Sequence, residues 1–304
     1  MASEAQAATL DEGPAATEIE PGRLPDWHEV RPRDTWPECD VLSAPPGFYS
    51  RIERFGSIDS TQRVVREWME SRSPEVAIAV ADVQTAGRGR LDREWHAPPA
   101  AALLLSAGFR PSRLLVRHGW RLAAVVSLAM VDAAEAAAGL AESTLRLKWP
   151  NDIVAALADG RLAKVAGVLG ESLAAGEGVG WSVVGIGINA DWAKADFPPN
   201  LAPNMTSLRE LAGGRPIDRE LLLDEFLARL EPRYEALRDG SFDAASWTAR
   251  QVTTDHTVEL DVGGTRLVGR ATGVEPETGA LLVDTDGLLR LIDSGEVVRC
   301  RLVR

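Results

Sequence analysis

The segment from Gln84 to Trp95 has the residue types of an anion-binding loop. It contains two glycines, which let a backbone come close to a ligand, and three arginines, whose forked guanidinium groups match carboxylate and phosphate oxygens. These five residues are Gly87, Arg88, Gly89, Arg90 and Arg93. The chain carries 45 acidic residues against 33 basic ones, so this concentration of arginine is not background composition. We predict a loop that holds an anion and closes over it.

Two glycine-containing apolar runs follow later in the chain. Lys164 lies between Leu162 and Leu169 among small residues, as if a ligand approached the backbone beside its ammonium group. The glycine spacing from Gly185 to Asn189 is similar to that of a dinucleotide-binding motif. That motif opens a helix, whereas this run lies inside a predicted strand, so a dinucleotide-binding motif is excluded. Its glycines are predicted to make room for a ligand, and Asn189 can hydrogen-bond a nucleotide.

Two further motifs combine turn or cap chemistry with possible ligand contacts. In Lys148-Trp-Pro-Asn-Asp152, Pro150 interrupts strand pairing and predicts a turn that points Asn151 and Asp152 outward. Asn and Asp favour turns in any case, and they could also contact nucleotide phosphates and Mg²⁺, which prefers oxygen ligands. Ser60-Thr-Gln62 begins a predicted helix that Ser60 or Asp59 can cap. The free N–H groups of such a helix end can also face a polar ligand.

These motifs must be positioned by a mixed domain of helices and strands that runs from about residue 48 to 251. Apolar runs and alternation predict strands at 76–83, 101–109, 145–148, 152–156, 163–173 and 181–189. Helical spacing and capping patterns predict helices at 61–71, 117–138, from Ser207, 219–238 and 241–250. Five short runs at 256–262, 265–274, 280–284, 287–292 and 296–302, separated by glycine-containing turns, predict a small barrel.

Composition excludes several classes of protein. A net charge of −12 argues against a general nucleic-acid binder. The two cysteines and four scattered histidines give no metal spacing and no disulfide framework, which favours a reducing, cytoplasmic environment. The longest apolar segment, 120–138, is interrupted by charges and is too short for a membrane span of ~20 residues. Residues 1–47, with ten acidic residues and seven prolines, are predicted to be disordered and to carry no signal peptide.

In their order along the chain, these motifs resemble those of biotin–protein ligases. They are Ser60-Thr-Gln62, Gln84-Thr-Ala-Gly-Arg-Gly-Arg90, Lys148-Trp-Pro-Asn-Asp152, Lys164-Val-Ala-Gly167 and Gly185-Ile-Gly-Ile-Asn189. The resemblance covers roughly residues 50 to 302. It implies an α+β fold, with a catalytic domain like that of class II aminoacyl-tRNA synthetases (48–252) containing a mixed sheet, and a small SH3-like β-barrel (253–304). The N-terminal extension (1–47) supplies no helix-turn-helix, which implies a monofunctional form that does not bind DNA.

The resemblance implies an enzyme that activates biotin with ATP as biotinyl-5′-AMP and transfers it to a lysine of a biotin carboxyl carrier protein domain. Lys164 and Arg88 would be catalytic. The implied biotin-binding residues are Ser60, Thr61, Gln62, Gln84, Gly87, Arg88, Gly89, Arg90, Lys164 and Gly167. The implied ATP-binding residues are Arg93, Trp95, Asn151, Asp152 and Asn189, with Asp152 also binding Mg²⁺. The enzyme would be a cytoplasmic monomer or homodimer.

The sequence departs from the family pattern at three positions. Gln62 stands where asparagine is usual, and Leu91 and Asp92 stand where a basic residue and a glycine follow the second arginine. The resemblance also implies that an arginine near the end of the barrel helps to hold ATP or the acceptor. Here that arginine would be either Arg299 or Arg301. Three alternatives stay open: a lipoate–protein ligase, a DNA-binding biotin sensor, and a biotin-binding module without catalysis.

Overall fold

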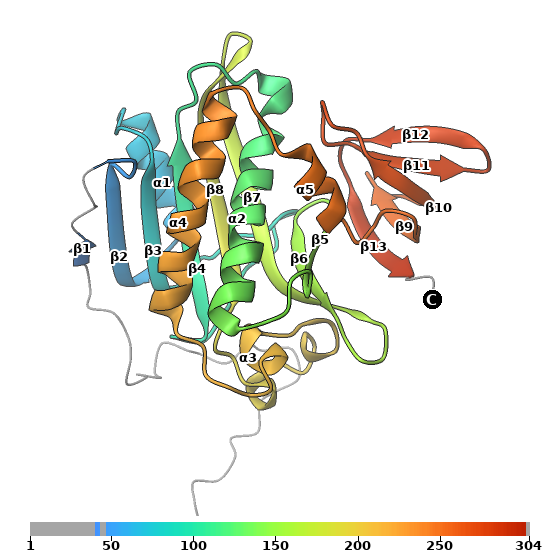
Figure 1. Ribbon diagram of the computed structural model, residues 1–304, viewed down its shortest axis with the longest axis horizontal. Coiled ribbons are helices and arrows are strands. Elements are labelled where there is room, and N and C mark those ends of the chain that lie inside the picture. Colours follow the sequence, from blue (N-terminus) through green and yellow to red (C-terminus); the bar gives the residue numbers. More distant parts are fainter. Residues whose placement is uncertain (1–39, 43–46, 302–304) are drawn as a thin grey trace, which may run out of the picture.

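A computed structural model describes residues 40–42 and 47–301 (Figure 1). Its largest element is an eight-stranded sheet with the order β1-β2-β3-β4-β8-β7-β6-β5. The strands are β1 (Asp40–Leu42), β2 (Arg51–Ile58), β3 (Ala77–Gln84), β4 (Ala102–Phe109), β5 (Leu145–Lys148), β6 (Asp152–Ala156), β7 (Leu162–Ala175) and β8 (Gly178–Asn189). Since β2 and β3 are parallel and the other described neighbours are antiparallel, the sheet is mixed.

Helices cover the two faces of this sheet unequally. Figure 1 shows α2 (Trp120–Ala138) and α4 (Arg219–Arg238) side by side over one face, where they pack against Ile78 and Val80 of β3. The alternate residues of the same strand, Ala77 and Ala79, face α1 (Thr61–Glu70) on the other side. Because α1 covers only part of that second face, the rest of it can form a cavity wall.

Short helices connect these layers. They are α3 (Leu208–Leu211), α5 (Ala244–Arg250) and the 3₁₀ turns η2 (Val116–His118), η3 (Lys194–Asp196) and η4 (Ala202–Asn204). The predicted cap of α3 is present, because Ser207 Oγ accepts from the backbone N–H of Glu210 at 3.2 Å. Among the helices of the described residues, none is long and apolar enough to cross a membrane.

A separate five-stranded antiparallel sheet, called the C-terminal sheet below, follows α5. It has the order β12-β11-β10-β9-β13 and lies beyond β5 and β6 (Figure 1). Its strands are β9 (Thr257–Val262), β10 (Thr265–Val274), β11 (Leu281–Thr285), β12 (Leu288–Ile292) and β13 (Glu296–Arg301). Trp149 of the larger domain is buried in the apolar core of this sheet, so the two domains share a packed contact.

Every strand and helix predicted from the sequence is present, with boundaries shifted by up to three residues. The structure adds β2, which the sequence analysis did not predict, and β1, which pairs antiparallel with it. Within the stretch predicted to be mostly disordered or loosely draped, residues 40–42 form a strand because β2 supplies the hydrogen bonds that local patterning did not indicate. Residues 1–39 and 43–46, and with them the predicted absence of a DNA-binding module, lie outside the described residues.

Candidate functional site

A cavity of about 1030 Å³ lies on the face of the large sheet that carries α1. Gly185 and Gly187 follow Val183 at alternate positions of β8, so they face the same side as α1 and line this cavity. Each of the five sequence motifs contributes to its wall. The predicted site residues that line it are Ser60, Thr61, Gln62, Gln84, Arg88, Gly89, Arg90, Arg93, Trp95, Asn151, Asp152, Lys164, Gly167 and Asn189. Gly87 lines a smaller cavity beside it.

The first turn of α1 is tied to the end of β3 by a buried polar chain. Gln84 Oε1 accepts from the backbone N–H of Thr61 at 2.8 Å and from its hydroxyl at 3.0 Å. The same hydroxyl lies 2.8 Å from Ser106 Oγ on β4. Ser60 occupies the N-cap position but its side chain makes no capping hydrogen bond, whereas Asp59, the alternative in the prediction, accepts from the backbone N–H of Ser60 at 2.7 Å. Gln84 caps the first N–H group of α1, because it reaches the helix end from the neighbouring strand.

The strand glycines make room for two side chains of the protein itself. A Cβ atom on Gly185 would stand 2.5 Å from Gln62 Oε1, and one on Gly187 would stand 2.7 Å from the indole of Trp95. The predicted room for a ligand is therefore occupied in part by Gln62, which is only 7% exposed, and by Trp95. The indole Nε1 of Trp95 is buried without a hydrogen-bond partner in the described structure.

Lys164 and Asp152 form an ion pair in the middle of the cavity wall. The β6–β7 pairing brings them together, and Lys164 Nζ lies 2.7 Å from Asp152 Oδ1. Their side chains are 37% and 22% exposed, so a ligand can reach both. Lys164 Nζ also lies 5.4 Å from the centre of the Trp95 ring system, a distance at which a cation is attracted to the ring face. Lys164, predicted to be catalytic, and Asp152, predicted to bind Mg²⁺, therefore neutralise each other's charge.

The two predicted asparagine ligands both donate to the backbone. Asn151 Nδ2 donates to the carbonyl of Val168 at 2.8 Å, and the buried Asn189 Nδ2 donates to the carbonyl of Thr206 at 3.0 Å. The turn predicted around Pro150 is confirmed, because β5 ends at Lys148 and β6 begins at Asp152. The amide nitrogens therefore hold the cavity wall together, which leaves their oxygens as the atoms that can meet a ligand.

The arginine-rich loop folds back on itself. The N–H of Gly89 donates to the carbonyl of Arg93 at 2.7 Å, and the N–H of Trp95 donates to the carbonyl of Gly87 at 2.9 Å. At the tip, Leu91 and Asp92 both have φ of +56°, a left-handed conformation that costs a residue with a side chain about 1–2 kcal/mol. These are two of the positions at which the sequence departs from the family pattern, and only glycine adopts that conformation without strain.

Two loop arginines are bound to the C-terminal sheet. Arg90 Nη1 donates to the carbonyl of Gly295 at 3.0 Å. Arg93 makes a bidentate ion pair with Glu296, with N–O distances of 2.7 and 2.6 Å. This pairing raises the pKa of Arg93 and lowers the pKa of Glu296 below its ordinary value. Within the described part of the chain, the guanidinium of Arg88 has no ion pair, so it is the loop arginine most open to an incoming anion.

Sequence reasoning missed several residues of the wall. Ser106 was the one hydroxyl in the apolar run that became β4, a signal that could have been used. Glu296 and the residues of the loop after β8 gave no local signal, because their contacts with the site come from tertiary packing. The missed lining residues include Ser106, Trp192, Asn200, Leu201, Asn204, Met205, Glu296, Val297, Val298 and Cys300. Arg299 and Arg301 lie on β13, but their side chains lie outside the described structure, so neither is preferred.

No group of three or more His, Cys, Asp or Glu side chains in the described residues could hold a metal ion. A protein cage for a metal is therefore absent from this part of the chain. Mg²⁺ needs no such cage where substrate phosphates supply most of its oxygens, and one or two carboxylates then suffice. Asp152, half-buried in the cavity wall, is the carboxylate that fits such a phosphate-bound ion.

Comparisons with known proteins agree with this geometry. The model of the biotin/lipoate A/B protein ligase family matches residues 55–189, which include every predicted site residue except the alternatives Arg299 and Arg301. The bifunctional ligase/repressor BirA of Bacillus spizizenii is 33% identical over 242 residues, which cover 79% of this chain and 71% of that protein. The biotin–[acetyl-CoA-carboxylase] ligase of Mycobacterium tuberculosis is 33% identical over 227 residues, 74% of this chain and 79% of that protein. The solved structure of a biotin protein ligase from Aquifex aeolicus in complex with biotin and ATP matches with a TM-score of 0.65, 29% identity, and coverage of 81% of this chain and 96% of that one.

Proposed function

This chain belongs to the biotin–protein ligases of the biotin/lipoate ligase family, and on that premise we propose that it attaches biotin to a protein lysine with the consumption of ATP. In the first half-reaction, the biotin carboxylate attacks the α-phosphorus of ATP, which gives biotinyl-5′-AMP and pyrophosphate. In the second, a lysine amine attacks the mixed anhydride, forms an amide and releases AMP. The observation that carries the proposal is the single cavity that all five motifs line.

The first half-reaction brings two anions together, so it requires cations at the point where they meet. We assign this role to Lys164 and Arg88. Lys164 is accessible from the cavity and has one nearby carboxylate, Asp152, from which an incoming phosphate or carboxylate can draw it. Arg88 has no competing ion pair within the described residues. Positioned charges of this kind act on the transition state, and losing one costs about 3–4 kcal/mol of barrier.

The polar chain at the start of α1 supports the biotin-binding residues. A biotin ring carries both hydrogen-bond donors and acceptors, and Ser60, Thr61, Gln62 and Gln84 supply both kinds of group at one buried end of the cavity. Gly87, Gly89, Arg90 and Gly167 would complete this end where the loop and β7 come close. The ligand would lie along β7 and β8 from this end towards Asp152.

The nucleotide would occupy the other end of the cavity. Arg93, Trp95, Asn151, Asp152 and Asn189 line it, and the indole of Trp95 offers an aromatic face on which a base can stack. Because the asparagine nitrogens are bound to the backbone, their side-chain oxygens are the atoms assigned to the nucleotide. Asp152 would hold Mg²⁺ that arrives with ATP, and the ion would neutralise phosphate charge.

We propose that the acceptor is a biotin carboxyl carrier domain of a biotin-dependent carboxylase; the name of the Mycobacterium tuberculosis relative gives acetyl-CoA-carboxylase as the acceptor of that protein. We propose a cytoplasmic enzyme that acts as a monomer or homodimer and does not bind DNA. The related lipoate–protein ligases remain the competing function within the same family, since the matching family model includes both.

Two measurements test the function. The protein with biotin and Mg-ATP should release pyrophosphate, and a carrier domain added to this mixture should gain the mass of one biotinyl group on a single lysine. Replacing biotin by lipoate should abolish both signals. Pyrophosphate release with lipoate but not with biotin would reassign the substrate, and no release with either would overturn the proposal.

A further inference from the structure

Three large apolar side chains are exposed where the larger cavity opens to solvent. They are Leu91 at the tip of the arginine-rich loop, Leu201 in the loop after β8, and Val298 on β13, with exposed fractions of 68%, 43% and 57%. All three also line the cavity. A side chain that lines a cavity and is also exposed to solvent lies at the mouth of that cavity. We call these three residues the apolar rim.

The loop holds Leu91 in its exposed position at a cost. Leu91 has φ of +56°, a conformation that is unfavourable for a residue with a branched side chain. On one side of it, Arg90 binds the carbonyl of Gly295. On the other side, Arg93 forms its bidentate pair with Glu296. Strained backbone of this kind persists where neighbouring contacts impose it, and it is concentrated at functional positions.

Local structure also places the other two residues of the apolar rim. The register between β13 and β9 shifts after Val297, so Val298 has no partner residue on β9. Val297 is buried in the core of the C-terminal sheet, whereas the bulge turns Val298 outward, and bulges re-aim side chains in this way beside active sites. Leu201 belongs to a loop that is bound to the cavity wall, since the N–H of Thr206 donates to the carbonyl of Lys164 at 2.9 Å.

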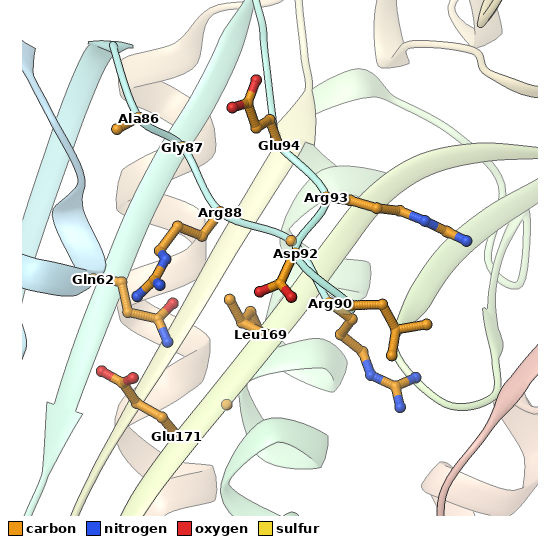
Figure 2. Close-up of a pocket in the computed structure, with 13 residues that line it drawn as sticks. Gln62, Ala86, Gly87, Arg88, Arg90, Asp92, Arg93, Glu94, Leu169 and Glu171 are labelled. Carbon is orange, nitrogen blue, oxygen red and sulfur yellow. The ribbon is translucent and has the colours of Figure 1, made fainter. Parts of the chain in front are cut away.

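The loop tip lies between the groups assigned to the reaction and the C-terminal sheet. In Figure 2, Arg88 and Arg93 extend to opposite sides of the loop. Arg88 lines the cavity as an assigned catalytic group, whereas Arg93 binds β13 through Glu296. Glu296 and, after it, Asp152 raise the pKa of Arg93. This end of the apolar rim is therefore near the carboxylate that pairs with Lys164.

The position of the apolar rim indicates contact with a protein partner. Single apolar residues scattered over a surface are ordinary, but here three of them, from three separate elements, lie at one opening. On the proposed function, biotin and ATP enter the cavity as small molecules, whereas the acceptor lysine arrives on the surface of a folded domain. The part of that surface next to the lysine must lie against the mouth of the cavity.

We propose that the apolar rim is the docking surface for the acceptor domain, which presents apolar side chains beside its lysine. This inference rests on the proposed function, because a protein acceptor exists only if biotin is transferred to a lysine. Docking buries apolar groups of both partners, and removing them from water favours association. The apolar rim thus determines how tightly the acceptor binds, whereas Lys164 and Arg88 determine how fast the adenylate forms.

The test separates binding of the acceptor from the chemistry in full-length variants. Leu91→Asn removes the apolar side chain at the loop tip, and asparagine tolerates the left-handed conformation there. Leu91→Met keeps an apolar side chain, and Val298→Thr changes the second element at nearly constant shape. The control Leu289→Asn alters an exposed leucine of β12 that lines neither cavity. Each variant would be mixed with preformed biotinyl-5′-AMP, and transfer would be measured to a carrier domain and to hydroxylamine, which has no protein surface.

Leu91→Asn should raise the KM for the carrier domain about 10-fold, the effect of losing one buried apolar side chain at an interface. Its kcat at saturating carrier domain, its transfer to hydroxylamine and its pyrophosphate release from biotin and ATP should stay at the wild-type level. Val298→Thr should raise the same KM. Leu91→Met and Leu289→Asn should keep the wild-type KM. A carrier domain whose exposed apolar residue nearest the lysine is changed to serine should show a raised KM with the wild-type enzyme and little further increase with Leu91→Asn.

An unchanged KM for the carrier domain in Leu91→Asn would overturn the inference. An equal loss of transfer to the carrier domain and to hydroxylamine would also overturn it, since Leu91 would then contact the adenylate. A raised KM in Leu289→Asn contradicts it as well, because the acceptor would then dock on β12. If Leu91→Asn folds poorly, Val298→Thr decides by the same two criteria. A wild-type protein that releases no pyrophosphate with biotin and ATP would instead refute the proposed function.

Discussion

At the scale of single residues, the pair of Lys164 and Asp152 shows how the site holds charge before substrates bind. Their 2.7 Å contact keeps a half-exposed lysine in place without leaving it uncompensated. On the proposed function, a phosphate or carboxylate that binds Lys164 would replace Asp152 as its partner, and Asp152 would then become available to a phosphate-bound cation. One ion pair would thereby prepare both partners for ligands of opposite charge.

Removing the lysine should therefore affect the first half-reaction most. We expect Lys164→Ala to lower the rate of pyrophosphate release by about 10²–10³-fold, the range for a lost charge-stabilising donor. Lys194→Ala, at an exposed position on η3, should leave the rate unchanged. Pyrophosphate release at the wild-type rate in Lys164→Ala would contradict the assignment of Lys164 as catalytic.

Gly187 offers a second test at this scale. In Gly187→Ala the new methyl carbon would stand 2.7 Å from the Trp95 indole, so the ring must move away from β8. We expect the affinity for ATP to fall by about 10-fold or more, since a base–aromatic stack contributes about 1–3 kcal/mol. Calorimetric titration would measure this. Gly178→Ala on the same strand, where a Cβ atom meets only ordinary contacts, should bind ATP normally. If Gly187→Ala and Gly178→Ala bind ATP with equal affinity, Trp95 does not take part in nucleotide binding.

Most residues that line the cavity could be predicted from the sequence, but the hydrogen-bond partners of their side chains could not. The types and spacing of Gln84 and Lys164 identified them as candidates. That Gln84 Oε1 caps α1 depends on β3 and α1 lying side by side, 23 positions apart in the chain. The same limit applies to Ser106, whose contact with the Thr61 hydroxyl depends on the packing of α1 against β4.

At the scale of elements, apolar periodicity was sufficient to predict the buried strands. In β3 every residue except the last is buried, and β4 is buried throughout, which gives the continuous apolar runs used for the prediction. By contrast, β2 contains Arg51, Glu53 and Arg54, and its pattern does not alternate cleanly. Its strand conformation comes from parallel pairing with β3, which no local signal reveals.

The contact of the arginine-rich loop with β13 gives an element-scale prediction. Glu296→Gln should release Arg93 and increase hydrogen exchange in residues 85–95 of the substrate-free protein, because the charge-assisted bidentate contact is lost. Asp293→Asn removes an exposed negative charge three residues earlier and should leave exchange in the loop unchanged. Identical exchange in all three proteins would mean that the ion pair does not restrain the loop.

The same contact should depend on pH. Arg93 lowers the pKa of Glu296 below its ordinary value of 4.5, so the folded state favours the charged carboxylate. A depressed carboxyl pKa gives stabilisation that is fully present above pH 4.5 and is lost as pH falls through the lowered value. After correction for the intrinsic pH dependence of exchange, loop protection should therefore stay constant from neutral pH to about 4.5 and decrease below it. Glu296→Gln should show no such step.

At the scale of the whole molecule, the cavity is completed by contacts between the two domains. β13 supplies part of its wall, and Arg90, Arg93 and Lys148 of the larger domain all bind residues 295–297. Lys148 precedes the predicted turn, and its Nζ donates to the carbonyl of Val297 at 2.8 Å. The motif that carries Asp152 thus also holds the C-terminal sheet beside the cavity.

Trp149 should be the strongest single link between the domains. It is 4% exposed, packs in the core of the C-terminal sheet and donates from its indole N–H to the carbonyl of Gly279 at 3.0 Å. Trp149→Ala should cost about 3–5 kcal/mol of packing, and the C-terminal sheet should then melt before the larger domain. Calorimetry would show two unfolding transitions. Titration would show a weaker affinity for ATP, because β13 would no longer line the cavity.

The control Trp149→Phe keeps most of the buried ring. It should lose only about 1 kcal/mol of stability and should unfold in a single transition. A single transition in Trp149→Ala, with unaltered ATP affinity, would show that the C-terminal sheet holds its place in the site through Arg90, Arg93 and Lys148 alone.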